Sequence, residues 1–97
     1  MTELKIEREE QGHRASVFIA QGGKRVAEMT FSRVNPTKWI IDHTEVDDSL
    51  RGQGAGRKLL DFAVDYARKN SLTYLPLCPF AKAQFDKDPS IRDVLSA

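Results

Sequence analysis

The sequence has little of several features that mark specialised classes of protein. It contains one cysteine, Cys78, and two histidines among 97 residues, so we expect no internal disulfide and no metal site. The 15 Lys and Arg against 14 Asp and Glu give a net charge of +1, and therefore no general attraction to nucleic acid or to a membrane surface. No apolar run is long enough to cross a bilayer and no export signal is present, which predicts a cytoplasmic protein.

The remaining composition is that of a small globular protein. Hydrophobic residues make up 40% of the chain and charged residues 30%, which suits one domain over residues 1–97 with a modest core. There are no internal repeats and no low-complexity segments. A second domain does not fit within this length.

The first half of the chain shows the alternation of apolar and polar residues that is typical of half-buried strands. The fourth of these runs is apolar on both faces at its start and turns polar before it closes on Val46, as expected of a central strand approaching a site. We also expect a turn over residues 10–14 and a glycine hairpin loop over 21–24. The predicted strands cover residues 4–7, 15–20, 25–34 and 39–46.

The second half begins with helical periodicity. Apolar residues between positions 59 and 67 recur at helical spacing, with charged residues on the other side, and Asn70 is expected to cap the helix. Residues 72–77 read as a short strand parallel to the fourth, with the helix as the crossover. Pro76 lacks an amide, which suits an edge strand or a strand whose partner has diverged. Short helices should follow at residues 79–85 and from Asp88-Pro89 onward.

A glycine-rich stretch connects the fourth strand to the long helix. Gly52, Gly54 and Gly56 alternate with other residues just before the helical pattern begins. Glycine permits positive φ angles and leaves no Cβ in the way of a ligand. The free amides and the positive dipole end of a helix N-terminus favour an anion such as phosphate. We therefore interpret this stretch as an anion-binding loop.

Two common phosphate-binding motifs do not fit this loop. A Walker A loop needs G-x-x-x-x-G-K-[ST], but Arg57 stands five residues after Gly52, and no Ser or Thr follows at the required place. A Rossmann G-x-G-x-x-G motif fails because Arg57 or Leu59 occupies the position of its last glycine. A strand-to-helix turn without any ligand stays open as the alternative.

The spacing Arg51-x-x-Gly54-x-Gly56 resembles the Q/R-x-x-G-x-G/A motif of the GNAT superfamily of N-acetyltransferases. The predicted element order over residues 14–87 is similar to the GNAT core, and residues 43–46 and 76–80 resemble a subfamily of very short GNAT-like predicted acetyltransferases. The resemblance implies an α/β (α+β) fold. Its sheet is mixed and mostly antiparallel, its parallel strands four and five splay apart, and one crossover helix and short C-terminal helices complete it.

The resemblance also implies acetyl-CoA as the cofactor. The pyrophosphate would bind the loop amides, the pantetheine arm would lie along strand four, and basic side chains would outweigh the repulsion from Asp47 and Asp48. Arginines in the first turn of a helix are disfavoured, so Arg51 and Arg57 also favour a bound anion, the alternative being exposed cations. The implied cofactor-binding residues are Val46, Arg51, Gly52, Gln53, Gly54, Ala55, Gly56, Arg57 and Lys82.

Three residues are candidates for the chemistry. Cys78 would lie at the cleft wall, where a thiol can accept the acetyl group or protonate the departing CoA thiolate; the alternative is a small buried hydrophobe. His43 and Glu45 alternate onto one face of the fourth strand, so either can act as the general base for an ammonium acceptor. Their alternatives are a hydrogen-bonded strand histidine and a solvated carboxylate.

The chain departs from typical GNAT enzymes on the acceptor side. Those enzymes carry two helices between strands one and two and a final hairpin, which the pattern here lacks. The resemblance thus implies two competing functions: an N-acetyltransferase for an unidentified amine or protein acceptor, and a non-catalytic CoA-binding module that acts through a protein partner. A purely structural protein with a glycine-rich turn is the third alternative.

Overall fold

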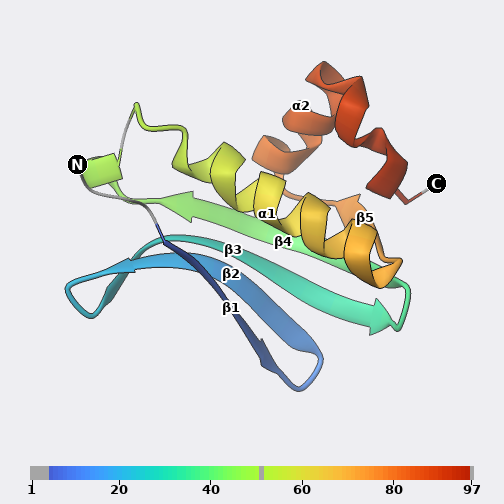
Figure 1. Ribbon diagram of the computed structural model, residues 1–97, viewed down its shortest axis with the longest axis horizontal. Helices are drawn as coiled ribbons and strands as arrows, with labels where there is room; N and C mark the ends of the chain where they lie inside the picture. Colours follow the sequence, from blue (N-terminus) through green and yellow to red (C-terminus); the bar gives the residue numbers. More distant parts are fainter. Residues whose placement is uncertain (1–4, 51, 97) are drawn as a thin grey trace.

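The computed structural model describes residues 5–50 and 52–96. Within this part of the chain, strands fill the first half and helices most of the second, in the order that the sequence predicts (Figure 1). The elements are β1 (Ile6–Gln11), β2 (Arg14–Gln21), β3 (Lys24–Asn35), β4 (Lys38–Val46), the 3-10 helix η1 (Asp48–Leu50), α1 (Ala55–Asn70), β5 (Thr73–Pro76), α2 (Pro79–Lys87) and the 3-10 helix η2 (Pro89–Val94).

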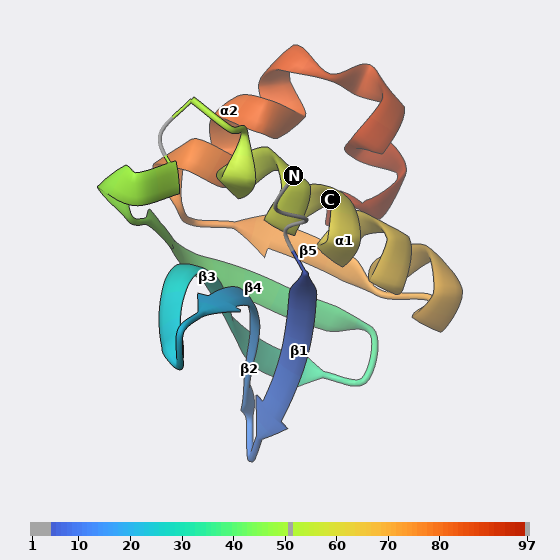
Figure 2. The same cartoon turned by 60° about the vertical axis from the view of Figure 1, so that its left-hand side comes forward.

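The strands form a single mixed sheet in the order β1-β2-β3-β4-β5. The first four are antiparallel neighbours, and β5 joins β4 in parallel after the α1 crossover. Helix α1 lies across one face of the sheet, and α2 and η2 lie beside it toward the β5 edge (Figures 1 and 2). The predicted fold class and the edge position of Pro76 are confirmed. No helix in the described part of the chain is long and apolar enough to span a membrane.

The core lies between α1 and the sheet face that it covers. Alternate strand residues such as Ile19, Met29 and Ile41 are fully buried on that face, because side chains along a strand point to opposite faces. Helix α1 contributes Leu59 and Leu60, together with small residues that allow close packing. Three aromatic rings pack at the centre, since Phe31 lies 5.9 Å from Trp39 and 5.4 Å from Tyr74 between ring centroids.

Several predicted boundaries differ from the observed ones. The turn expected over residues 10–14 is narrower, because β1 continues to Gln11 and β2 begins at Arg14. Asn70 is the last residue of α1, and the C-cap is Ser71, which adopts the left-handed conformation with φ of 56°. The strand predicted over residues 72–77 is too long by one residue at each end, since β5 covers Thr73–Pro76.

The chain end returns to the sheet. Asp88 caps η2 by accepting a hydrogen bond of 2.9 Å from the Ser90 amide, as the Asp-Pro pair predicts. Ile91 and Val94 are buried against the body. The Ser96 amide then donates to the Tyr74 carbonyl at 2.8 Å, so this end of the chain covers part of the outer edge of β5.

Gly56 allows α1 and α2 to approach each other closely. A Cβ at this position would lie 2.9 Å from Cζ of Phe80, a distance at which one of the two groups must move. Gly56 has an ordinary helical conformation, unlike Gly52 and Gly54, which have positive φ angles. The third glycine of the loop therefore has a packing role between two helices.

We predict that Gly56→Ala destabilises the fold on the order of 1 kcal/mol. Overpacking costs about 1–3 kcal/mol, which exceeds the gain of up to about 1 kcal/mol in helix propensity. Urea unfolding measures the change. On a Phe80→Leu background, where the ring is absent, the same substitution should be neutral or stabilising; an equal loss on both backgrounds would contradict the contact as its cause.

Candidate acetyl-CoA site

Strands β4 and β5 separate after a short paired segment. Their parallel register runs from Lys38 opposite Thr73 to Ile41 opposite Pro76. The amides of Leu77 and Cys78 then both donate to the carbonyl of Ile41, at 3.1 and 3.2 Å. Beyond this point β4 continues to Val46, whereas the segment that follows β5 turns into α2. Strands four and five therefore splay apart, as the resemblance implied, and we call the opening between them the cleft.

A β-bulge in β4 decides which side chains face each side of this cleft. Phe31 of β3 pairs with Ile41, but the preceding Thr30 pairs with His43, so Asp42 is an extra residue in β4. An extra residue reverses the alternation of side chains beyond it. Thr44 and Val46 consequently share the α1 side of the sheet with the buried residues of β3. His43 and Glu45 lie together on the opposite face, which we call the open face.

The last part of β4 presents backbone groups to the edge that β5 has left. The Asp47 amide donates to the Val26 carbonyl at 2.7 Å, and the backbone groups of successive residues in an antiparallel strand alternate between its two edges. Glu45 therefore directs its backbone groups toward β3. Thr44 and Val46 direct theirs toward the cleft, where a ligand with amide groups can pair with them.

Cys78 lies on the α1 side of the cleft. Its side chain is buried, with 4% of the residue exposed, and its Sγ lies 3.3 Å from Oγ1 of Thr44. The structure thus places Cys78 where the two strands separate, with a contact that the sequence did not predict, and its burial equally fits the alternative of a small buried hydrophobe. No pattern in the sequence points to Thr44, because the bulge that turns it toward Cys78 has no sequence signal in this strand.

His43 and Glu45 lie on the open face, as their alternation predicted. Both are exposed, and neither side chain forms a hydrogen bond or ion pair with any residue that the structure describes. The cleft therefore has a thiol on one face of the sheet and an imidazole and a carboxylate on the other. This arrangement separates a group that can donate a proton from groups that can accept one.

The glycine loop ends at an uncapped helix N-terminus. Gly54 is the N-cap of α1 in the left-handed conformation, with φ of 67°, and no side chain caps the helix. A Cβ at Gly54 would meet nothing within 4 Å, so the space beside it is open. The first hydrogen bond of the helix runs from the Lys58 amide to the Gly54 carbonyl at 3.0 Å. The amides of residues 55–57 therefore have no acceptor within the helix.

Comparisons with known proteins identify the family. The model of the GCN5-related N-acetyl-transferase family matches residues 14–94, which is most of the chain. This chain belongs to the GCN5-related N-acetyltransferase (GNAT) family. The family is one of acetyl-CoA-dependent N-acetyltransferases, as the sequence motif implied. The search of curated protein sequences found no match.

Solved structures give the same fold. A GCN5-like protein from Staphylococcus aureus is 36% identical, with a TM-score of 0.75, and the match covers 100% of this chain and 92% of that one. The ribosomal-protein-S18-alanine N-acetyltransferase from Escherichia coli is 20% identical, with a TM-score of 0.64 and coverages of 80% and 53%. AAC(6')-Iy, solved with a CoA bisubstrate analogue, is 14% identical, with a TM-score of 0.52 and coverages of 84% and 62%. The GNAT chain described here spans about half the length of the E. coli enzyme.

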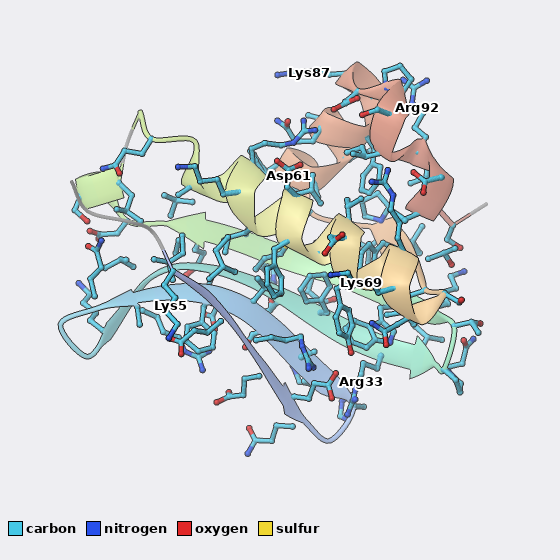
Figure 3. All side chains as sticks on the ribbon, in the orientation of Figure 1. Lys5, Arg33, Asp61, Lys69, Lys87 and Arg92 are labelled. Atoms are coloured by element: carbon cyan, nitrogen blue, oxygen red, sulfur yellow. The ribbon has the colours of Figure 1, made fainter. Side chains whose placement is uncertain are left out.

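Two of the predicted basic residues of this GNAT site, Arg57 and Lys82, have their contacts away from the loop. The Arg57 guanidinium points toward α2, where Nε lies 2.8 Å from Oδ1 of Asp61 and Nη1 lies 3.0 Å from Oε1 of Gln84; it also pairs with Asp88. Figure 3 shows Asp61 on the side of α1 that faces α2. Its carboxylate partners explain why this arginine is tolerated in the first helical turn, without a bound anion. Arg51 lies outside the described residues.

Lys82 lies on another face of α2. It follows Phe80 by two residues, which places it about 200° around the helix from the side that touches Gly56. Its neighbours are instead Leu75 and Leu77 of the β5 region, with which it lines a groove. The structure therefore does not bring Lys82 to the glycine loop.

The remaining loop residues divide by environment. Gln53 is exposed, and its backbone amide donates to the Leu50 carbonyl at 3.2 Å, within the turn. Ala55 is buried, and Val46 is 40% exposed at the end of β4. Asp47 accepts hydrogen bonds from the Ser49 hydroxyl and amide, which lower the pKa of its carboxyl group. The hydrogen bonds from Ser49 of η1 therefore favour the charged form of Asp47 beside the loop.

The Asp88 carboxylate joins η2 to the first turn of α1. Hydrogen bonds from Ser90 and the Arg57 guanidinium lower the pKa of Asp88 from an ordinary 3.8 to about 2. Because the folded-state pKa is depressed, the stabilisation is present above the unfolded-state pKa. It is lost as the pH falls toward the folded-state value.

We predict that Asp88→Asn lowers the melting temperature at neutral pH, because the substitution removes the charge that pairs with Arg57. The difference from the wild type should narrow as the pH falls from 4 toward 2, which thermal unfolding over this range would measure. Asp86→Asn is the matched control, since the Asp86 side chain pairs with no residue of the described segments. A difference for Asp88→Asn that does not vary with pH would contradict the ion pair.

Proposed function

We propose that this GNAT-family protein is an N-acetyltransferase, which binds acetyl-CoA along the open edge of β4 and at the N-terminus of α1 and acetylates a primary amine. The observation that carries the proposal is the separation of β4 from β5 after Ile41. It leaves the backbone groups of Thr44 and Val46 available to a ligand. The N-terminus of α1, which follows β4 in the chain, is also uncapped. A cytoplasmic location remains part of this proposal.

The residues present suit the parts of the cofactor. Backbone amides of residues 55–57 and the positive end of the α1 dipole would hold the pyrophosphate, and the open space beside Gly54 admits it. The amide groups of the pantetheine arm would pair with Thr44 and Val46, as an added strand pairs with a sheet edge. We therefore assign the phosphate contacts to the loop backbone of residues 52–57 instead of to the side chains of Arg57 and Lys82. Arg51 remains a candidate from the motif.

The chemistry follows from the two faces of the cleft. Acetyl-CoA supplies an acetyl thioester whose carbonyl carbon would lie between the strands. His43 or Glu45 would take a proton from an ammonium that arrives over the open face, because only the neutral amine can form the new C–N bond. Cys78, on the α1 side, would give a proton to the CoA sulfur as the C–S bond breaks. The nitrogen would release its second proton to solvent as the amide forms, and Cys78 would regain a proton from solvent. The Cys78 thiol donates to Oγ1 of Thr44 at 3.3 Å, and this contact would position it.

A non-catalytic CoA-binding module is the second candidate. It is favoured by the open face of the sheet, over which Figures 1 and 2 show no helix among the described residues. Such a module would bind acetyl-CoA with the same residues and present it to a partner protein. Release of free CoA in the presence of an amine separates the two candidates, because only a catalytic protein consumes acetyl-CoA repeatedly.

We predict that Gly54→Val abolishes acetyl-CoA binding measured by calorimetry. The new side chain would fill the space beside the amides, and the positive φ angle would add about 1–3 kcal/mol of strain. Gly54→Asn is the control, since asparagine tolerates the left-handed conformation. It should remain stable yet also bind weakly; wild-type affinity in the Asn variant would contradict the placement of the pyrophosphate.

We predict that Cys78→Ala lowers amine acetylation by about 10²- to 10⁴-fold, the usual contribution of a general acid, while acetyl-CoA affinity is retained. Intact-mass measurement of the wild type with acetyl-CoA should show no acetyl group on the protein. An added acetyl group that hydroxylamine removes, and that is absent from Cys78→Ala, would instead make Cys78 the nucleophile. Since this is the only cysteine, the assignment is unambiguous.

A further inference from the structure

The two walls of the cleft differ in chemistry on the open face. From β4 come Asp42, His43 and Glu45, which are polar. On the β5 side, Tyr74 points into the core and Cys78 points toward Thr44 on the α1 side. Because side chains alternate along an extended chain, Leu75 and Leu77 point the other way, to the open face. An acceptor that approaches the thioester thus meets carboxylates on one wall and leucines on the other.

The apolar wall continues into a groove along the outer edge of β5. The groove has a volume of about 320 Å³, and Leu75, Leu77, Phe85 and Leu95 provide its apolar lining. Leu77 is 61% exposed and Leu95 is 36% exposed. Exposed apolar surface that gathers beside a site, with polar residues around it, is typical of ligand binding. The apolar side of the groove therefore has room for the body of an acceptor.

The charges around this surface place the attraction for a cation at the β4 wall. Asp42 accepts a hydrogen bond of 2.7 Å from the Ser32 hydroxyl and lies 3.8 Å from Arg14, whereas Glu45 has no ion-pair partner among the described residues. A cation therefore finds a free carboxylate at the β4 wall. Lys82 and Asp86 both line the groove, and their opposite charges balance, so the groove itself adds no net attraction for a cation.

Building on the proposed transferase activity, we propose that the acceptor is a monoamine with an apolar body. Its ammonium group lies against the carboxylates of β4, and its hydrocarbon part lies in the groove formed by Leu75, Leu77, Phe85 and Leu95. A polyamine or a lysine-rich segment fits this surface poorly, because its further charges would lose their water against the leucines.

Hexylamine and 1,6-diaminohexane provide a matched test, since they differ in length by one atom and in the charge at the far end. We expect the wild type to acetylate hexylamine with a kcat/KM on the order of tenfold or more above that of the diamine, because burying each CH₂ favours binding about fourfold. Leu77→Ser should lower kcat/KM for hexylamine several-fold and leave that for the diamine nearly unchanged. Val34→Ser is the control, because Val34 is 54% exposed on β3 and does not line the groove.

Two results would overturn this inference while the transferase activity stands. One is equal use of both amines or a preference for the diamine, and the other is the same loss in Leu77→Ser and Val34→Ser. If neither amine is acetylated, the proposed function fails, and binding decides the inference. Hexylamine added with CoA should then shift the methyl NMR signals of Leu75, Leu77 and Leu95 in a saturable manner, and unchanged signals would refute the groove.

Discussion

The separation of β4 from β5 is the constraint on which the rest of the site depends. Two successive amides, of Leu77 and Cys78, converge on the carbonyl of Ile41 and end the pairing. If β5 continued in register, the backbone groups of Thr44 and Val46 would be used within the sheet and no ligand could pair with them. Pro76 and Pro79 help to end the strand, because proline has no amide to donate to a ladder.

The bulge at Asp42 gives this cleft two different faces. Without the extra residue, Thr44 would point to the open face, and His43 and Glu45 would point into the core, where unpaired charged groups are costly. With it, the thiol of Cys78 has a hydroxyl partner on the α1 side, and the possible bases face solvent. A single irregularity in one strand thus determines which groups can handle protons on each side of the proposed thioester position.

Sequence reasoning predicted the fold well because hydrophobic periodicity, turn residues and the crossover connection all indicated the same arrangement. It placed Cys78, His43 and Glu45 correctly relative to the strands. It did not predict the bulge, since no residue type marks it, or the contacts of Arg57 with Gln84 and Asp88, because both are distant in the sequence. Asp61 lies four residues after Arg57, so the i,i+4 spacing could have indicated that ion pair. The glycines of the motif are also required for two different reasons. Gly54 adopts a positive φ beside open space, whereas Gly56 makes room for Phe80.

Amide hydrogen exchange at the end of β4, with and without acetyl-CoA, tests whether this strand edge binds the cofactor. We expect acetyl-CoA to slow exchange at Thr44 and Val46, whose amides face the cleft. Exchange at Glu45 should change little, because its amide is already directed toward β3. Protection of the alternate residues would show a ligand paired along the strand edge. Unchanged exchange at Thr44 and Val46 under saturating acetyl-CoA would contradict the central claim that this edge binds the cofactor.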